Sequence, residues 1–201
     1  GQLVAPSEKL ARFGHNVSRA LAKRLAPRAG KLRADATAAK LFLHADGTPL
    51  VESENLVQVE LASVLTRIRT RGLSDLYGGV MGRQWLAAST SQGGKATIDD
   101  LRRYRAVWRK TERRKIGNQI LHFPVLGPGE SPALKLSRLL KSASVAAAAA
   151  QVFDSSDIAG TTERGEAGFV VGDSFGSAAA CVFQMNGAFG NGVVAPNMGV
   201  F

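Results

Sequence analysis

Two adjacent threonines, Thr161 and Thr162, stand just ahead of the most strand-like part of the chain. A threonine hydroxyl becomes a nucleophile when cleavage of the chain frees the residue's own α-amine, which then serves as the base. The bond before Thr161 follows a glycine, Gly160. The pair therefore makes Thr161 a candidate catalytic nucleophile and the Gly160-Thr161 bond a candidate site of self-cleavage.

A β-hairpin would have to position this nucleophile. Residues 168–173 and a segment that begins at Ser177 are short and apolar, and a Gly/Ser turn separates them. Short apolar runs bounded by turn residues are typical of paired strands. We expect the threonines to lead into the first of these two strands.

The same segment resembles the start of the catalytic chain in the γ-glutamyltransferase (glutathione hydrolase) family. Asn186, Phe189, Gly190 and Gly192 match the family pattern Asn-x-x-Phe-Gly-x-Gly at its own spacing. Asp173 matches the aspartate of the family's first strand when the alignment continues without gaps. The resemblance implies that Asn186 lies near the nucleophile and the substrate, although it could instead cap the strand and its turn.

The alignment leaves two candidates for the position of the nucleophile. Without gaps, Glu166 and Ala167 stand where the family has its two threonines. An insertion of five residues places Thr161 there instead. Unless those residues loop out, they displace the hydroxyl by more than about 10 Å along the strand. Glu163 also replaces the histidine that normally follows the family's threonine pair.

Landmarks in the first two thirds of the chain resemble the same family. Residues 77–81 read Tyr-Gly-Gly-Val-Met and are similar to the family's Phe-Tyr-x-Gly helix. Residues 93–104 contain a Gly-Gly turn and resemble its Thr-x-x-Asp-Leu-x-x-Tyr segment. Residues 124–132 resemble its Pro-rich turn, with the usual serines and double glycine replaced.

The resemblance implies an α+β fold, the αββα sandwich of N-terminal nucleophile hydrolases, which is incomplete in this chain. We expect a helix-rich basic part over residues 1–142, similar to the family's large subunit. An Ala-rich helix and linker over 143–160 precede a β-hairpin part over 161–201, similar to the start of the small subunit. Another polypeptide or subunit is expected to supply the missing strands, since an open sheet edge invites pairing.

Two functions follow from the resemblance. In the first, Thr161 is freed and attacks a γ-glutamyl amide of the glutathione type, and the acyl-enzyme passes to water or to an amine. In the second, Glu166 occupies the nucleophile's place and the protein is a pseudoenzyme retained as a binding or structural subunit. The gapless alignment, the missing histidine and the altered Pro-rich turn favour the second. A γ-glutamyl substrate is expected only in the first.

The chain is a basic protein with the composition of a folded domain. Its 201 residues are 45% apolar and 21% charged and carry a formal net charge of +10. Residues 1–142 hold 25 of the 26 Lys and Arg residues. The basic run 102–115 includes Tyr104 and Trp108, which could stack on bases. Because no nucleic-acid motif accompanies it, we interpret this run as a solvated helix end and strand or as a protein-contact surface.

Other classes of site are not indicated. The three histidines are scattered, so neither a metal site nor a cofactor is predicted. Cys181 is expected to be a small buried residue within the second strand. The apolar run 143–152 is well short of the about 20 residues of a transmembrane helix. An exported or periplasmic location follows from family analogy alone.

Caps and hydrophobic spacing predict the remaining elements. The expected helices cover residues 6–14, 16–30 (or 18–30), 32–43, 55–70, 97–104 and 133–140. A further helix is expected to begin at Ser74 and to carry Leu76, Tyr77, Val80, Met81 and Trp85 into a core. Residues 44–49 are expected to form a turn, Gly72 to end a helix, and residues 119–125 to form a strand.

Overall fold

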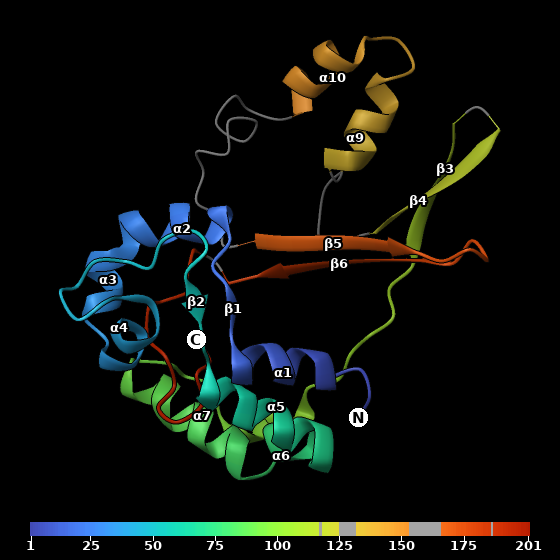
Figure 1. Ribbon diagram of the computed structural model, residues 1–201. Coiled ribbons are helices and arrows are strands. Elements are labelled where there is room, and N and C mark those ends of the chain that lie inside the picture. Colours follow the sequence, from blue (N-terminus) through green and yellow to red (C-terminus); the bar gives the residue numbers. More distant parts are fainter. Residues whose placement is uncertain (117, 125–131, 153–165, 186) are drawn as a thin grey trace. The chain divides into compact units, whose positions relative to one another are not determined.

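The chain forms two compact units (Figure 1). A computed structural model describes residues 1–116, 118–124, 132–152, 166–185 and 187–201. Unit 1 contains Gly1–Tyr104 and Arg164–Phe201, and unit 2 contains Arg105–Glu163. Unit 1 therefore combines the first half of the chain with its last residues.

Unit 1 is mainly helical and carries two small antiparallel ladders, β1-β2 and β5-β6. Its elements are α1 (Ala5–Phe13), β1 (His15–Asn16), α2 (Arg19–Leu25), the 3-10 helix η1 (Ala26–Arg28), α3 (Ala29–Arg33), α4 (Ala36–Phe42), β2 (Asn55–Leu56), α5 (Val59–Arg71), α6 (Ser74–Tyr77), α7 (Val80–Ser91), α8 (Ile98–Arg103), β5 (Glu166–Gly172) and β6 (Ala178–Gln184). Unit 2 contains β3 (Thr111–Ile116), β4 (Gln119–Pro124), α9 (Pro132–Leu139) and α10 (Val145–Val152).

Side-chain caps set the starts of the early helices. The Ser18 hydroxyl accepts a hydrogen bond from the Leu21 backbone N–H at 3.2 Å and begins α2. The Asp35 carboxylate accepts one from the Ala38 N–H at 2.7 Å and begins α4. Because Asp35 starts a new helix, the single helix predicted over residues 32–43 is wrong, and α3 and α4 take its place.

The helix predicted over residues 55–70 also begins later than expected. Asn55 and Leu56 pair with Asn16 and His15 as β2 and β1, so α5 starts only at Val59. This pairing joins segments that lie far apart in the sequence, so no pattern in the residues around Asn55 could have predicted it. The other end was predicted correctly, because Gly72, with a φ of 74°, ends α5.

Asp75 divides the next predicted helix into α6 and α7. Its carboxylate accepts hydrogen bonds from the Val80 N–H at 3.0 Å and from the Arg67 guanidinium, and so caps α7. Gly79 lies so close to Asp75 that a Cβ added at Gly79 would be 2.2 Å from a carboxylate oxygen of Asp75. Ser74 does not cap a helix, since its hydroxyl donates to the Arg71 carbonyl.

The capping box predicted at residues 97–100 is confirmed at the start of α8. The Thr97 hydroxyl accepts from the Asp100 N–H at 3.2 Å, and the Asp100 carboxylate accepts from the Thr97 N–H at 2.8 Å. The Thr97 hydroxyl also donates to this carboxylate and is the main reason that the pKa of Asp100 lies below its ordinary value. Beyond the helix, the Tyr104 ring stacks on Tyr77 with centroids 5.6 Å apart.

Two clusters of buried apolar residues hold unit 1 together. The first contains Val17, Leu25, Leu32, Ala38, Phe42, Leu56, Phe189 and Val194, and the second contains Val64, Met81, Ala195 and Met198. Met81 was predicted to enter a core and does so, and Trp85 packs against the second cluster. Val80 was predicted there too, but it is exposed at the first position of α7. Both clusters join early helices to the last residues of the chain.

A charged group fastens α1 to α5, which lie side by side in Figure 1. The Glu8 carboxylate accepts hydrogen bonds from Arg69 at 2.7 Å, from Thr66 at 2.8 Å and from Arg12 at 3.3 Å. The hydrogen bond from Arg69 is the largest reason that the pKa of Glu8 lies below its ordinary value of 4.5, and the bond from Thr66 is the next. The ionised form of Glu8 is therefore favoured in the folded protein.

This group predicts an acid-sensitive contribution to stability. Because the folded-state pKa of Glu8 is depressed, its contribution is fully present above about pH 4.5 and is lost as the pH falls through the lowered folded value. Glu8→Gln should therefore lower the free energy of unfolding at pH 7 more than at pH 3, as measured by urea unfolding at both values. Glu52→Gln, which breaks only the exposed pair with Arg19, is the matched control. An equal loss at both pH values for Glu8→Gln would contradict this assignment.

Unit 2 contains a β-hairpin and two helices. Arg113 lies opposite His122, and Lys115 opposite Ile120, so these residues share one face of the β3-β4 hairpin. The Lys135 ammonium donates to the Gln151 carbonyl at 3.0 Å and joins α9 to α10. The predicted strand over residues 119–125 and helix over 133–140 are thus confirmed as β4 and α9, each within one residue at both ends.

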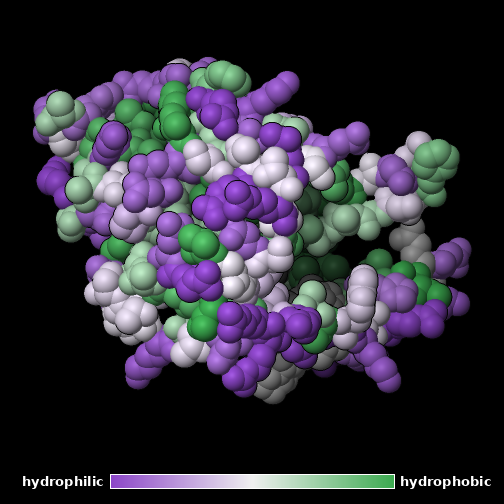
Figure 2. Space-filling model, turned by 90° about the horizontal axis from the view of Figure 1, so that it is seen from below, coloured by the Kyte–Doolittle hydropathy of each residue, from purple (hydrophilic) through white to green (hydrophobic). Residues whose placement is uncertain are grey.

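Polar side chains dominate the face of the molecule shown in Figure 2, with apolar ones between them. Basic residues from the run 102–115, such as Arg113 and Lys115, are exposed, and Trp108 is fully exposed. These residues match the interpretation of the run as a helix end followed by a strand, now α8 and β3. Within the part of the chain that the structure describes, no helix is both long and apolar enough to cross a membrane.

Candidate functional site

The candidate site is the open end of the β5-β6 hairpin together with the turn that follows β6. Thr161 and Asn186, the two predicted catalytic residues, lie outside the described residues, and their roles stay predictions. The described residues that flank them are Glu166, which opens β5, and Met185 and Gly187 on either side of position 186. The described part of the site therefore consists of the residues around these two positions.

The hairpin is regular from end to end. Its pairs run without interruption from Glu166 opposite Gln184 to Gly172 opposite Ala178. Antiparallel pairing brings the start of β5 beside the end of β6. In the gapless alignment, the family's nucleophile falls at the start of β5 and its asparagine falls at position 186, just after β6. Cys181, predicted to be buried, is only partly buried opposite Phe169, because the faces of this two-stranded ladder are largely exposed.

Asp173 forms the turn at the closed end of the hairpin. Its carboxylate accepts hydrogen bonds from the backbone N–H groups of Phe175 and Ser177, each at 2.9 Å. The bond from Ser177 is the largest reason that the pKa of Asp173 lies below its ordinary value. Asp173 thus fixes the register of the strands, since the turn determines which residues pair.

A compact turn follows β6 and contains the rest of the Asn-x-x-Phe-Gly-x-Gly pattern. The Gly190 N–H donates to the Gly187 carbonyl at 3.1 Å, and the Gly192 N–H donates to the Phe189 carbonyl at 2.8 Å. Phe189, Gly190 and Gly192 have φ values of 63°, 53° and 84°. A phenylalanine rarely adopts a positive φ, so the surroundings of Phe189 must hold it there.

Aromatic packing provides that support. The Phe189 side chain is 7% exposed and belongs to the first apolar cluster. Its ring centroid lies 5.6 Å from that of Phe42 in α4 and 5.8 Å from that of Phe201 at the end of the chain. The turn that carries the family pattern is therefore anchored in the core of unit 1.

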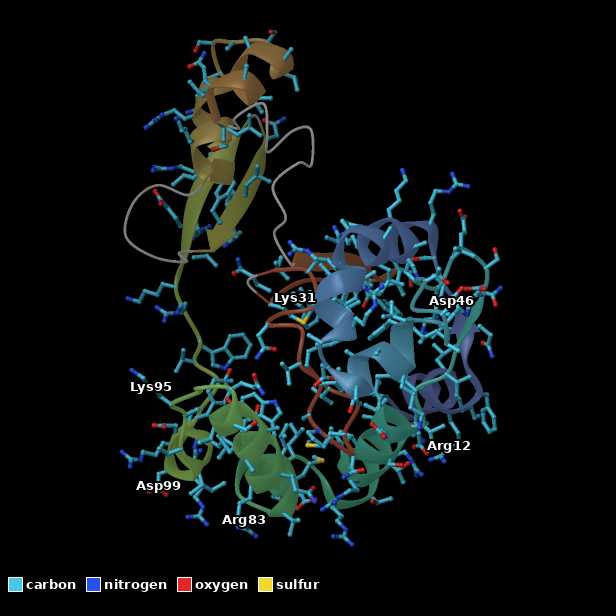
Figure 3. All side chains as sticks on the ribbon, turned by 90° about the vertical axis from the view of Figure 1, so that its left-hand side faces the viewer. Arg12, Lys31, Asp46, Arg83, Lys95 and Asp99 are labelled. Carbon is cyan, nitrogen blue, oxygen red and sulfur yellow. The ribbon has the colours of Figure 1, made fainter. Side chains whose placement is uncertain are left out.

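Lys31 of α3 holds the same turn from outside. Its ammonium donates to the Gly190 carbonyl at 2.9 Å. Its aliphatic stem lies over Gly192, where an added Cβ would be 2.8 Å from the Lys31 Cε atom. In Figure 3, Lys31 lies where its helix meets the C-terminal segment. Glycine at 192 is thus required both by its φ and by the close approach of Lys31.

Two cavities adjoin Met185, the residue before the predicted asparagine. One has a volume of about 370 Å³ and lies between α2, the open end of the hairpin and the turn. The other has a volume of about 270 Å³ and is lined by α7 residues such as Trp85 and by Asn191, Val193 and Phe201. Cavities at this position could receive parts of a ligand on either side of the strand end. Among the described residues, no group of three or more His, Cys, Asp or Glu side chains could hold a metal ion.

Comparison with known proteins decides the family. A sequence profile described as gamma-glutamyltranspeptidase matches residues 1–130. The chain belongs to the gamma-glutamyltranspeptidase family. This is the γ-glutamyltransferase family that the sequence motifs resemble, so the predicted family is confirmed.

Two curated relatives in the gamma-glutamyltranspeptidase family are named glutathione hydrolase proenzyme. The relative from Escherichia coli (strain K12) is 33% identical over 108 residues, which are 54% of this chain and 19% of the relative. The relative from Bacillus subtilis (strain 168) is 34% identical over 103 residues, which are 51% of this chain and 17% of the relative. The matched part of the chain thus spans less than a fifth of the length of either relative.

Solved structures show the fold. A gamma-glutamyltranspeptidase from Helicobacter pylori matches with a TM-score of 0.61 and 24% identity, over 73% of this chain and 42% of that one. A gamma-glutamyltranspeptidase from Pseudomonas nitroreducens complexed with L-DON matches with a TM-score of 0.59 and 26% identity, over 70% of this chain and 41% of that one. A cephalosporin acylase from Bacillus halodurans matches with a TM-score of 0.65 and 18% identity, over 98% of this chain and 46% of that one. The predicted N-terminal nucleophile hydrolase-like fold, incomplete in this chain, is confirmed.

The sequence motifs did not indicate two cations from the early helices that lie at the candidate site. Lys31 contacts a carbonyl 159 residues away, and Arg24 lines the larger cavity together with hairpin residues. Neither residue belongs to a motif. Only the folded chain brings these cations to the end of the hairpin.

Proposed function

We propose that this chain is part of a γ-glutamyltransferase-like protein that neither cleaves itself nor transfers γ-glutamyl groups, and that serves as a binding or structural subunit. The observation that supports this proposal most directly is the start of β5. The strand opens on Glu166 and Ala167, which the gapless alignment puts in the place of the family's two threonines. A carboxylate and a methyl group provide neither the hydroxyl nor the freed amine that the family's chemistry needs.

The regular ladder supports the gapless alignment on which this proposal rests. Glu166 pairs with Gln184 in an uninterrupted register that reaches Gly172 and Ala178. Thr161 precedes the first residue of β5 by five positions. Moving Thr161 to the head of the strand by a slip of register would displace every β5 side chain by more than about 10 Å. Because five is an odd number of residues, this slip would also turn every β5 side chain to the opposite face of the hairpin.

The alternative is an active γ-glutamyl hydrolase or transferase, and family membership favours it. Both curated relatives are named glutathione hydrolase proenzyme. In this alternative, the Thr161 α-amine takes the hydroxyl proton as the Thr161 Oγ bonds to the carbonyl carbon of a γ-glutamyl amide. The C–N bond of the amide then breaks, and the leaving amine receives that proton from the α-amine. Water or another amine then takes the acyl group. Asn186 would contact the substrate or the reacting atoms.

Another polypeptide or a further part of the protein is proposed to cover the hairpin. Val170 and Val182 are each 77% exposed, and Phe175 is 91% exposed. Apolar strand residues that are this exposed are typical of an interaction surface. A layer packed on the faces of the hairpin would bury these residues, and strands added to β5 or β6 would extend the sheet, as the αββα sandwich requires.

The mass of the polypeptide chains distinguishes the two functions. The full protein that contains this segment should be analysed under denaturing conditions and assayed with γ-glutamyl-p-nitroanilide, with the Escherichia coli relative as positive control. We expect one unbroken chain through Glu166 and no release of p-nitroaniline above the uncatalysed rate. A break at Gly160-Thr161 that Thr161→Ala abolishes, together with p-nitroaniline release, would overturn the proposal and establish the enzyme.

A further inference from the structure

The larger cavity at the open end of the hairpin has the features of a ligand site. It has a volume of about 370 Å³, within the range that binds small molecules. Leu21 of α2 forms one wall, and Phe183, Met185 and Phe189 form another. Phe183 is 57% exposed and Met185 is 50% exposed, so their apolar surface meets water when the cavity is empty. An apolar group in the cavity would remove part of that surface from water.

Among the described residues that line this cavity, Arg24 alone carries a charged side chain. Arg24 is exposed on α2, and no hydrogen bond or ion pair engages it among the described residues. The described lining includes no acidic residue. The Ser18 hydroxyl, the other polar group, already accepts a hydrogen bond from Leu21. The cavity thus combines apolar walls with a single available guanidinium.

The position of the cavity connects it to the family's reacting groups. Ala167, the second residue of β5, and Met185, the residue before Asn186, both line it. A ligand there would lie against the head of β5, where the gapless alignment puts the family's nucleophile. The residues on the opposite wall, Leu21 and Arg24, come from α2 and lie outside the family motifs described above.

We propose that this cavity binds an amphipathic monocarboxylate, with its apolar group against Phe183 and Met185 and its carboxylate on Arg24. A guanidinium and a carboxylate form short, charge-assisted hydrogen bonds, frequently in a bidentate arrangement. A neutral amide of the same shape would keep the apolar contacts and lose the ion pair. This inference rests on the proposed function in one respect: both assign a binding role to a chain that does not catalyse γ-glutamyl transfer.

The test uses the full protein and two matched probes, 4-phenylbutyrate and its neutral amide, with binding measured by isothermal titration calorimetry. We expect saturable binding of one carboxylate per chain and affinity for the amide that is lower by about tenfold or more. Arg24→Gln should weaken carboxylate binding by about tenfold and leave amide binding unchanged. Lys23→Gln removes the neighbouring charge of the same helix and should change neither.

A blocking variant tests the place of binding. Ala20 is exposed and lines the cavity, so Ala20→Trp should fill part of it and abolish binding of both probes. Thermal unfolding of each variant establishes that the fold is intact. Equal effects of Arg24→Gln and Lys23→Gln, unchanged binding in Ala20→Trp, or no binding to the unsubstituted protein because other polypeptide fills the cavity would each overturn the inference. Chain mass, which tests the proposed function, is independent of all three results.

Discussion

Phe42→Ala should lower the free energy of unfolding by about 3–5 kcal/mol. Phe42 is 4% exposed and lies at the centre of the first apolar cluster. Its ring contacts Phe189 and Phe201, with centroid distances of 5.6 Å and 5.8 Å. Truncation would remove both contacts and leave a cavity that the surrounding helices can only partly fill.

Urea unfolding followed by far-UV circular dichroism measures this loss. Phe13→Ala is the matched control, because Phe13 is 72% exposed and its truncation should change stability by less than about 0.5 kcal/mol. Hydrogen exchange should also become faster at Gly190 and Gly192, since the turn loses the support of Phe189. Similar losses for Phe42→Ala and Phe13→Ala would show that Phe42 is not a core residue.

Gly82→Ala should destabilise the protein by about 1–3 kcal/mol, although alanine is the better helix former. Gly82 is buried in α7, and an added Cβ would lie 2.1 Å from the Leu76 carbonyl oxygen and 3.3 Å from a methyl group of Leu101. The carbonyl belongs to the backbone of α6 and cannot rotate away. The steric conflict must therefore separate α6 from α7.

Gly30→Ala is the control and should have the opposite sign. Gly30 lies in α3, and an added Cβ would meet no atom within 4 Å. The substitution should stabilise the protein by about 0.4–1 kcal/mol, because alanine restricts the unfolded chain. Thermal unfolding of both variants tests the pair. A gain in stability for Gly82→Ala would contradict the close packing of α6 against α7.

Local signals in the sequence predicted the elements that depend on neighbouring residues. Thr97 and Asp100 form their capping box from a four-residue pattern, and Gly72 ends α5 where its sequence position indicated. Asp35 could have been recognised as a cap, since Asp is a favoured residue at that position, but the apolar pattern around it continues into α4. The helix break at Asp35 was therefore missed.

Contacts between distant segments could not be predicted from one sequence. β1 and β2 contain two residues each, and only the pairing of His15 with Leu56 and of Asn16 with Asn55 makes them strands. The site depends in the same way on Arg24, because α2 reaches the hairpin only in the folded chain. The family motifs pointed to the hairpin, whereas the cation that lines the cavity at its open end is placed there by tertiary structure.

The contact between Lys31 and Gly190 also has a consequence for synthesis of the protein. The two residues are 159 positions apart, and Val194 completes the cluster that begins with Val17. The early helices therefore leave the ribosome long before their core can close. Contacts of such high sequence separation form slowly, and the exposed apolar faces invite aggregation meanwhile. We expect the nascent chain to remain a substrate for chaperones until residues 189–201 emerge.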